Sequence, residues 1–270
     1  MLTAGIDLGS VCTKVAILAG DRLAGHAVAA TGHDPDATAR KLLAVALEMA
    51  GKTRQDLSRV VSTGYGRRRA AAAHSTISEI SANAAGAAWL AGNGVRTIID
   101  IGGQDSKVIS LDARGRIANF VMNDKCAAGT GRFLEAMADL LRVPLAEFGE
   151  VSLQAKDPIK IDNTCVVYAK SEVHSLLVHG AQKADLIAGL HRSIAQRVAV
   201  LARRVGVESP VLFDGGPAKN GGLRRALEEE LGVRLVVPEM PQIVTAIGAA
   251  LIAQDADAGR ELIQSGEGRQ

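Results

Sequence analysis

The stretch Gly5-Ile6-Asp7-Leu8-Gly9-Ser10 has the same pattern of residue types as a later stretch, Ile99-Asp100-Ile101-Gly102-Gly103-Gln104. In both, an apolar strand-like run carries an aspartate and ends at a glycine turn, after which a second apolar run returns (Lys14–Ala19 and Lys107–Leu111). The two aspartates, at positions 7 and 100, lie 93 residues apart. A solenoid needs at least three repeats, so one duplication predicts two lobes of related structure.

Working outward from these stretches, strand-like and helical patterns alternate along the rest of the chain, which predicts an α/β fold. The expected strands are Ala4–Leu8, Lys14–Ala19, Leu23–Ala29, Val60–Ser62, Arg96–Ile101, Lys107–Leu111, Ile117–Met122, Val211–Phe213 and Val233–Val237. The expected helices are Pro35–Gly51, Ile80–Leu90, Gly131–Leu141, Val166–Leu177, Lys183–Val205, Leu223–Leu231 and Gln242–Ala253, and Leu145–Gln154 is an amphipathic segment.

We expect an N-terminal lobe over 1–95 and a C-terminal lobe over 96–240 that carries two of the cysteines. Residues 241–270 are expected to form a closing helix that returns to the N-terminal lobe, followed by a frayed tail. No low-complexity linker separates the lobes, so a cleft between them is expected.

The composition excludes several classes of protein. The 270 residues carry 31 basic and 29 acidic side chains, a net charge of +2, and only 3% are aromatic, so nucleic-acid binding is not expected. No run of 18 apolar residues occurs, and the N-terminus lacks a basic leader, so neither a membrane span nor a signal peptide is expected. The three cysteines are too few for a disulfide framework, which points to the reducing cytoplasm.

The glycine turns are candidate phosphate-binding loops. Glycine lets backbone N–H groups approach phosphate oxygens, and an aspartate beside the turn holds Mg²⁺ through water. The first set is Asp7, Gly9, Ser10 and Lys14, and the second is Asp100, Gly102, Gly103 and Gln104. A third glycine turn, Asp214–Asn220, joins a buried strand to a helix, where backbone N–H groups point at an anion.

Two cysteines are candidate metal ligands. Cys126 precedes a Gly-Thr-Gly turn that opens a helix, and Cys165 opens another helical run. Both positions are close to the positive end of a helix dipole, which favours a thiolate. They are 39 residues apart, so they form no CxxC motif, and two buried structural cysteines remain the alternative. Cys12 lies in the first hairpin and is expected only to pack.

The three glycine loops resemble those of the acetate kinase–sugar kinase–heat-shock ATPase–actin fold, with two duplicated ribonuclease H-like lobes and a nucleotide cleft between them. The segment Asn123–Glu135, together with Thr63–Arg67 and Asp100–Lys107, resembles the activators of 2-hydroxyacyl-CoA dehydratases. The ATPase subunits of benzoyl-CoA reductase belong to the same family. The similarity extends over nearly the whole chain.

The resemblance implies an ATPase that couples hydrolysis of Mg-ATP to electron transfer. It implies a homodimer that shares one [4Fe–4S] cluster between Cys126 and Cys165 of both chains. The implied partners are a dehydratase or benzoyl-CoA-reductase-type component and, upstream, ferredoxin or flavodoxin. Asp7 and Asp100 are expected to handle Mg²⁺, and Gln104 to orient the attacking water. The residues expected to contact the nucleotide are Gly9, Ser10, Thr13, Lys14, Gly102, Gly103, Gly129, Gly131, Gly215, Gly216, Lys219 and Asn220.

Two other functions remain open on the sequence. A small-molecule kinase of the same fold needs a base for the substrate hydroxyl, and Asp105 or Asp124 is the candidate. A non-catalytic actin-like scaffold does not need three intact nucleotide loops.

Overall fold

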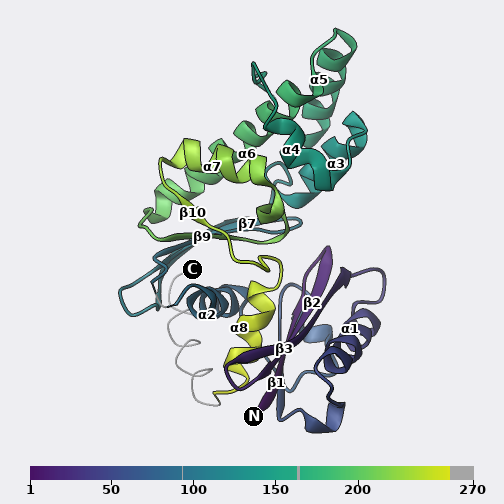
Figure 1. Cartoon of the computed structure of the whole chain (residues 1–270), viewed down its shortest axis with the longest axis vertical. Coiled ribbons are helices and arrows are strands. Elements are labelled where there is room, and N and C mark those ends of the chain that lie inside the picture. Colours follow the sequence, from purple (N-terminus) through teal and green to yellow (C-terminus); the bar gives the residue numbers. More distant parts are fainter. Residues whose placement is uncertain (93, 163–164, 256–270) are drawn as a thin grey trace. The chain divides into compact units, whose positions relative to one another are not determined.

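The computed structural model describes residues 1–92, 94–162 and 165–255. These residues form two compact units (Figure 1). The first contains Met1–Val95, Leu111–Ala118 and the chain from Gln242, and the second contains Arg96–Ser110 and Asn119–Pro241. The frayed tail expected over the last dozen residues falls outside the described residues.

The first sheet has five strands in the order β3-β2-β1-β4-β5. Strands β1 and β2 pair antiparallel, as do β2 and β3, whereas β4 runs parallel to β1, and β5 parallel to β4. The central strand β1 is buried along its whole length. The bounds are β1 Leu2–Leu8, β2 Cys12–Ala19, β3 Arg22–Ala30, β4 Arg59–Thr63 and β5 Ser75–Thr76, with helices α1 Pro35–Met49, α2 Glu79–Ala91 and α8 Val244–Ile252 and the short 3₁₀ helices η1 Arg54–Asp56 and η2 Arg67–Arg69.

Helix α1 begins where its sequence predicts. Asp34 is the N-cap, and its side chain accepts a hydrogen bond from the Ala37 N–H (3.0 Å). Pro35 at the first helical position has a backbone angle that suits a helix. The apolar face, which includes Leu42, Leu43 and Leu47, packs into the core beside β1–β3.

Helices α2 and α8 pack against each other at glycines. A Cβ on Gly248 would lie 1.7 Å from the carbonyl oxygen of Ala82, and one on Gly86 would lie 2.1 Å from that of Val244. Helix α8 also packs on β1, where a Cβ on Gly5 would lie 1.9 Å from the carbonyl oxygen of Ala246. The last helix of the described chain thus packs against its first strand.

The second sheet also has five strands, in the order β10-β9-β6-β7-β8. Strand β6 pairs antiparallel with β7 and parallel with β9, which runs parallel to β10. The bounds are β6 Thr97–Ile101, β7 Ser106–Leu111, β8 Ile117–Asn123, β9 Val211–Asp214 and β10 Leu235–Val236, with helices α3 Gly131–Leu141, α4 Phe148–Ser152, α5 Val166–Val178, α6 Lys183–Val205 and α7 Gly221–Leu231 and the 3₁₀ helices η3 Leu145–Glu147 and η4 Gly216–Lys219.

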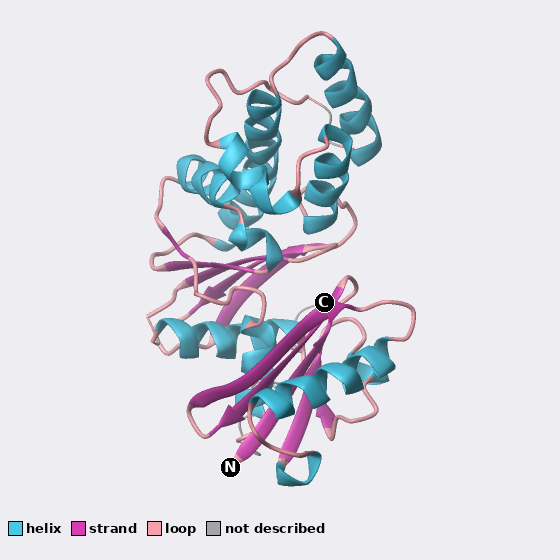
Figure 2. Ribbon diagram, turned by 45° about the vertical axis from the view of Figure 1, so that its right-hand side comes forward, coloured by secondary structure: helices cyan, strands magenta, loops and turns pink. Residues whose placement is uncertain are grey.

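The fold class expected from the sequence is confirmed: both sheets are mixed and carry helices (Figure 2). In each, a hairpin (β1-β2 or β6-β7) lies beside a parallel strand (β4 or β9). The pattern overestimates one strand, since the strand expected at Val233–Val237 spans only Leu235–Val236. The amphipathic segment Leu145–Gln154 forms a 3₁₀ turn followed by the short α4. None of the described helices is long and apolar enough to cross a membrane.

The close approach of α2 and α8 predicts a stability effect. Gly248→Ala forces the two helix backbones apart, and overpacking of this kind costs about 1–3 kcal/mol. We expect a melting temperature several degrees below that of the parent protein in a thermal scan. Gly94→Ala is the control, because the nearest atom to its added Cβ is 3.8 Å away. Equal melting temperatures for the two variants would contradict this packing.

Candidate functional site

The first glycine hairpin contains a buried ion pair. The Lys14 ammonium donates to Asp7 Oδ2 at 2.8 Å, and the two residues face each other across β1 and β2. The Asp7 side chain is only 3% exposed. Its other oxygen, Oδ1, has no hydrogen-bond partner among the described residues. The pair therefore leaves one buried carboxylate oxygen with unused acceptor capacity.

Hydroxyl groups shape the loop of this hairpin. The Thr31 hydroxyl donates to the Gly9 carbonyl (2.7 Å), so it accepts the hydrogen bond from the Thr13 hydroxyl (3.0 Å). A Cβ on Gly9 would lie 2.7 Å from the carbonyl oxygen of Cys12, so the tight turn needs glycine here. Of the residues expected to contact nucleotide, Ser10 is exposed, whereas Thr13 is buried and its hydroxyl is used within the loop.

The second hairpin repeats the ion pair and adds a carboxylate. Lys107 faces Asp100 across β6 and β7, and its ammonium lies 3.3 Å from Asp100 Oδ2 and 2.9 Å from Asp105 Oδ2. Lys107 is 1% exposed. From the sequence, Asp105 is expected only as a possible kinase base, and Lys107 is not among the expected site residues. The seven-residue spacing shared by Asp7–Lys14 and Asp100–Lys107 is the signal that would have found it.

The third loop lies directly against this ion-pair cluster. Asp214 at the end of β9 is fully buried. It is paired with Asp100 on the adjacent parallel strand β6, so the two are register neighbours. Gly215 has a φ of +87°, and a Cβ there would lie 2.1 Å from the Ile101 carbonyl oxygen and 2.9 Å from Asp100 Oδ1. Only glycine fits this approach, which brings the second and third glycine loops together.

The second loop is hydrogen-bonded to the segment that carries Cys126. The carbonyl groups of Gly102 and Gly103 accept from the backbone N–H groups of Gly131 and Arg132, each at 2.9 Å. The Ser106 hydroxyl donates to the Gly129 carbonyl (2.7 Å). The Gly102 N–H is itself used within the turn, since it donates to the Asp105 carbonyl (2.9 Å).

Gly131 is also close to the third loop. A Cβ on Gly131 would lie 3.3 Å from the Gly102 carbonyl oxygen and 3.6 Å from Pro217 Cγ. The start of α3 therefore sits where the second and third glycine loops meet, and a larger residue at position 131 would crowd both.

The two cysteines have different surroundings. Cys126 is half-buried and packs against the core of the second unit, and its carbonyl accepts from the Asn123 side chain (3.1 Å). Cys165 is exposed and is the N-cap residue of α5, as expected, whereas Cys126 precedes α3 by several residues. Among the described residues, no group of three or more His, Cys, Asp or Glu is suited to a metal ion.

The side chain of Asn220 is used within the second unit. Its Oδ1 accepts from the Leu223 N–H (2.9 Å), which caps α7, and its amide group donates to His191 Nε2 (3.0 Å). The Ser152 hydroxyl donates to the Gly149 carbonyl, so it accepts from His191 Nδ1 (3.1 Å). Burial lowers the pKa of His191 to about 3, which keeps the ring neutral. This chain of hydrogen bonds ties the third loop to α4 and α6.

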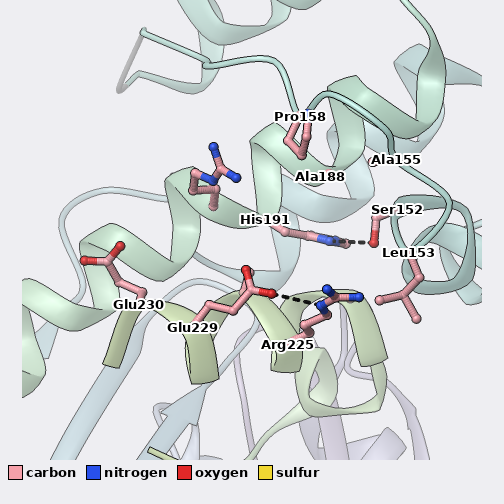
Figure 3. Close-up of a pocket in the computed structure, with 12 residues that line it drawn as sticks. Ser152, Leu153, Ala155, Pro158, Ala188, His191, Arg225, Glu229 and Glu230 are labelled. Atoms are coloured by element: carbon pink, nitrogen blue, oxygen red, sulfur yellow. Dashed lines mark hydrogen bonds and ion pairs between the residues drawn. The ribbon is translucent and has the colours of Figure 1, made fainter. Parts of the chain in front are cut away.

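A cavity of about 380 Å³ lies beside His191, between α4, α6 and α7 (Figure 3). Its walls include Leu153, Pro158 and the Arg225–Glu229 ion pair (2.9 Å). None of the residues that the sequence predicts for the nucleotide or the cysteine site lines it. It is therefore a feature separate from the glycine loops.

Comparison with known proteins gives a consistent result. The model of the BadF/BadG/BcrA/BcrD ATPase family matches residues 4–253. The chain is 46% identical over 257 residues to the activator of lactoyl-CoA dehydratase from Anaerotignum propionicum, covering 95% of this chain and 98% of that one. It is 45% identical over 253 residues to the (R)-2-hydroxyglutaryl-CoA dehydratase activating ATPase from Acidaminococcus fermentans, with 93% and 96% covered.

A solved structure is similar along the whole chain. It is the activator of the 2-hydroxyisocaproyl-CoA dehydratase from Clostridium difficile with bound ADPNP, with a TM-score of 0.90, 41% identity and 100% of both chains covered. At this identity and coverage, the likeness extends to both units.

The buried neutral His191 predicts a pH effect on stability. Its folded pKa lies below the unfolded value of about 6.5, so the unfolded chain takes up the proton first as the pH falls. This stability is therefore lost as the pH falls through 6.5, by about 2 kcal/mol between pH 7.5 and 5.0. In urea titrations, His191→Gln should be less stable than the parent at pH 7.5 but lose about 2 kcal/mol less over that interval. The exposed His174, changed to Gln, is the control; a parent-like acid loss in His191→Gln would contradict the assignment.

Proposed function

The chain belongs to the BadF/BadG/BcrA/BcrD ATPase family, and we propose that it is an ATP-driven electron-transfer activator of a 2-hydroxyacyl-CoA dehydratase or a related acyl-CoA reductase. The names of the two relatives, a dehydratase activator and a dehydratase-activating ATPase, support this assignment. The observation that carries it is the pair of hydrogen bonds from Gly131 and Arg132 to Gly102 and Gly103, because they join a phosphate-type loop directly to a cysteine segment.

The residues of the glycine hairpins suit Mg-ATP. Bound Mg²⁺ neutralises negative charge on the phosphates. The unpaired Oδ1 of Asp7 is an acceptor for a water of the hydrated ion, and Asp100 offers a second carboxylate. The backbone N–H groups of Gly9 and Gly103 face phosphate oxygens without a Cβ in the way. The exposed Gln104 orients the water whose oxygen bonds to the γ-phosphorus while the bond to the ADP oxygen breaks.

The cysteines suit an iron–sulfur cluster shared by two chains. Cys126 and Cys165 are both free thiols of the second unit, and thiolates are the usual ligands of such clusters. One chain supplies two, and a [4Fe–4S] cluster takes four, so the other two come from a second copy. The side chains of Val167 and Tyr168, next to Cys165, are 68% and 65% exposed and give that copy an apolar surface. When bound, the cluster supplies the one-electron chemistry, with ferredoxin or flavodoxin as the donor.

The hydrogen bonds around Gly131 provide the coupling. A change of the Gly102–Gly103 loop on ATP hydrolysis moves the amides of Gly131 and Arg132, and through them the segment of Cys126. The alternative of a small-molecule kinase is less well supported. Its candidate base Asp105 is held in an ion pair with the Lys107 ammonium (2.9 Å), and the two relatives named above are a dehydratase activator and an activating ATPase rather than kinases.

The proposed nucleotide site predicts a loss of ATP hydrolysis. Asp7→Asn and Asp100→Asn each remove a charge from the Mg²⁺ site, and we expect kcat to fall at least about 100-fold. The iron content should not change, because neither residue is a proposed cluster ligand. Asp21→Asn, in an exposed turn, is the control and should match the parent protein. Parent-like hydrolysis with normal Mg²⁺ dependence in either variant would show that the nucleotide site is wrongly assigned.

The proposed shared cluster predicts the iron stoichiometry. Anaerobically purified protein should contain about four iron atoms per pair of chains. Cys126→Ser and Cys165→Ser should each lose the iron, since each change removes two of four ligands, yet both should still bind ATP. Cys12→Ser is the matched control and should retain it. Iron analysis together with molecular mass decides the matter: four irons on a monomer, or full iron in either ligand variant, would rule out the shared cluster.

A further inference from the structure

The loop Thr63–Arg67, which follows β4, has the same local build as the third glycine loop, which follows β9. Thr63 is the register neighbour of Asp7, just as Asp214 is of Asp100. The next residue is in each case a glycine with positive φ: +85° at Gly64 and +87° at Gly215. A 3₁₀ helix follows both, η2 in the first unit and η4 in the second.

The two glycines make equivalent close approaches. A Cβ on Gly64 would lie 2.7 Å from the Leu8 carbonyl oxygen and 2.6 Å from Asp7 Oδ1. The corresponding atoms around Gly215 are the Ile101 carbonyl oxygen and Asp100 Oδ1. Thr63–Arg67 is thus the counterpart, within the first unit, of the loop that carries Gly215 and Gly216.

Hydrogen bonds hold the Thr63–Arg67 loop against the residues that follow Asp7. The Gly66 N–H donates to the Leu8 carbonyl (2.9 Å), and the Ser62 hydroxyl donates to the Arg67 carbonyl (2.8 Å). The Arg67 guanidinium donates to the Gly64 carbonyl (3.1 Å). The position of Thr63 beside Asp7 is therefore fixed by its surroundings.

Two polar atoms at this place are buried without a partner. Neither Thr63 Oγ1 nor Asp7 Oδ1 has a hydrogen-bond partner among the described residues, and their residues are 0% and 2% exposed. Register neighbours on parallel strands direct their side chains to the same face of the sheet. An unsatisfied buried hydroxyl costs about 1–3 kcal/mol, so the pair marks a place that a polar ligand completes.

We propose that Thr63 is a further residue of the nucleotide site, and that its hydroxyl, together with Asp7 Oδ1, binds the hydrated Mg²⁺–phosphate group of ATP. A hydroxyl both donates and accepts, so it complements the acceptor-only carboxylate of Asp7 toward bound water and phosphate oxygen. The inference rests on the proposed function, since it takes Mg-ATP as the ligand.

The matched pair Thr63→Val and Thr63→Ser tests it. Valine keeps the shape of threonine and suits a strand, but lacks the hydroxyl. Without nucleotide, Thr63→Val should melt at a higher temperature than the parent, because it removes an unsatisfied buried group. Its half-saturating Mg²⁺ concentration for ATP hydrolysis should rise about 10-fold or more, and its thermal shift on addition of Mg-ADP should shrink. Thr63→Ser should restore both.

Thr3→Val is the control, a loss of a buried hydroxyl that does have a hydrogen-bond partner. Thr3 is buried on β1, but its hydroxyl donates to the Ala250 carbonyl (2.9 Å). This variant should melt lower than the parent and keep its Mg²⁺ dependence.

The outcomes separate the two proposals. If Thr63→Val melts lower and its Mg²⁺ dependence and Mg-ADP shift match the parent, the hydroxyl is structural and this inference is overturned. If the parent is stabilised by Mg-ADP but does not hydrolyse ATP, the proposed function fails, while the Mg-ADP shift of Thr63→Val still decides the role of Thr63. A parent protein that neither hydrolyses ATP nor responds to Mg-ADP overturns both.

Discussion

The aspartate–lysine pair across each glycine hairpin is the interaction on which the site depends. A carboxylate buried without a partner is strongly unfavourable, and the cross-strand ammonium is what makes Asp7 and Asp100 tolerable in the interior. Because antiparallel register fixes which residues face each other, the lysine must lie seven positions after the aspartate in both hairpins. The ion pair therefore constrains the length of the glycine turn. The length of the turn determines which backbone N–H groups it can present to a ligand.

The two hairpins differ at the positions around this pair. Lys107 is fully buried and forms ion pairs with Asp100 and Asp105, whereas the Lys14 side chain is 18% exposed and forms an ion pair with Asp7. The register neighbour of the aspartate is a hydroxyl in the first unit, Thr63, and a carboxylate in the second, Asp214. The same backbone arrangement thus presents different polar groups in the two units.

The sequence predicts the elements well and the use of individual side chains less well. Apolar periodicity locates α3 and α6 to the residue, because both are long or strongly amphipathic. It misses β5, which has only two residues, and the 3₁₀ turns. The partners of Lys107 and the unpaired Thr63 hydroxyl depend on strand register and on neighbouring loops, which no local pattern encodes. The side chain of Asn220, a residue expected to contact nucleotide, caps α7 and binds His191, because α6 brings the imidazole next to it.

Peptide planarity offers a route by which the phosphate contact proposed at the second loop would reach a cysteine. The N–H of Gly103 and the carbonyl of Gly102 belong to one rigid peptide unit, as do the N–H of Gln104 and the carbonyl of Gly103. Both carbonyls accept hydrogen bonds from the start of α3, at Gly131 and Arg132. In the proposed activator, an N–H that turns toward or away from a phosphate therefore turns the carbonyl on its opposite side. The hydrogen bond at that carbonyl then shifts the segment that follows Cys126, so ligand binding and the position of the thiol are coupled through two peptide groups without any side chain.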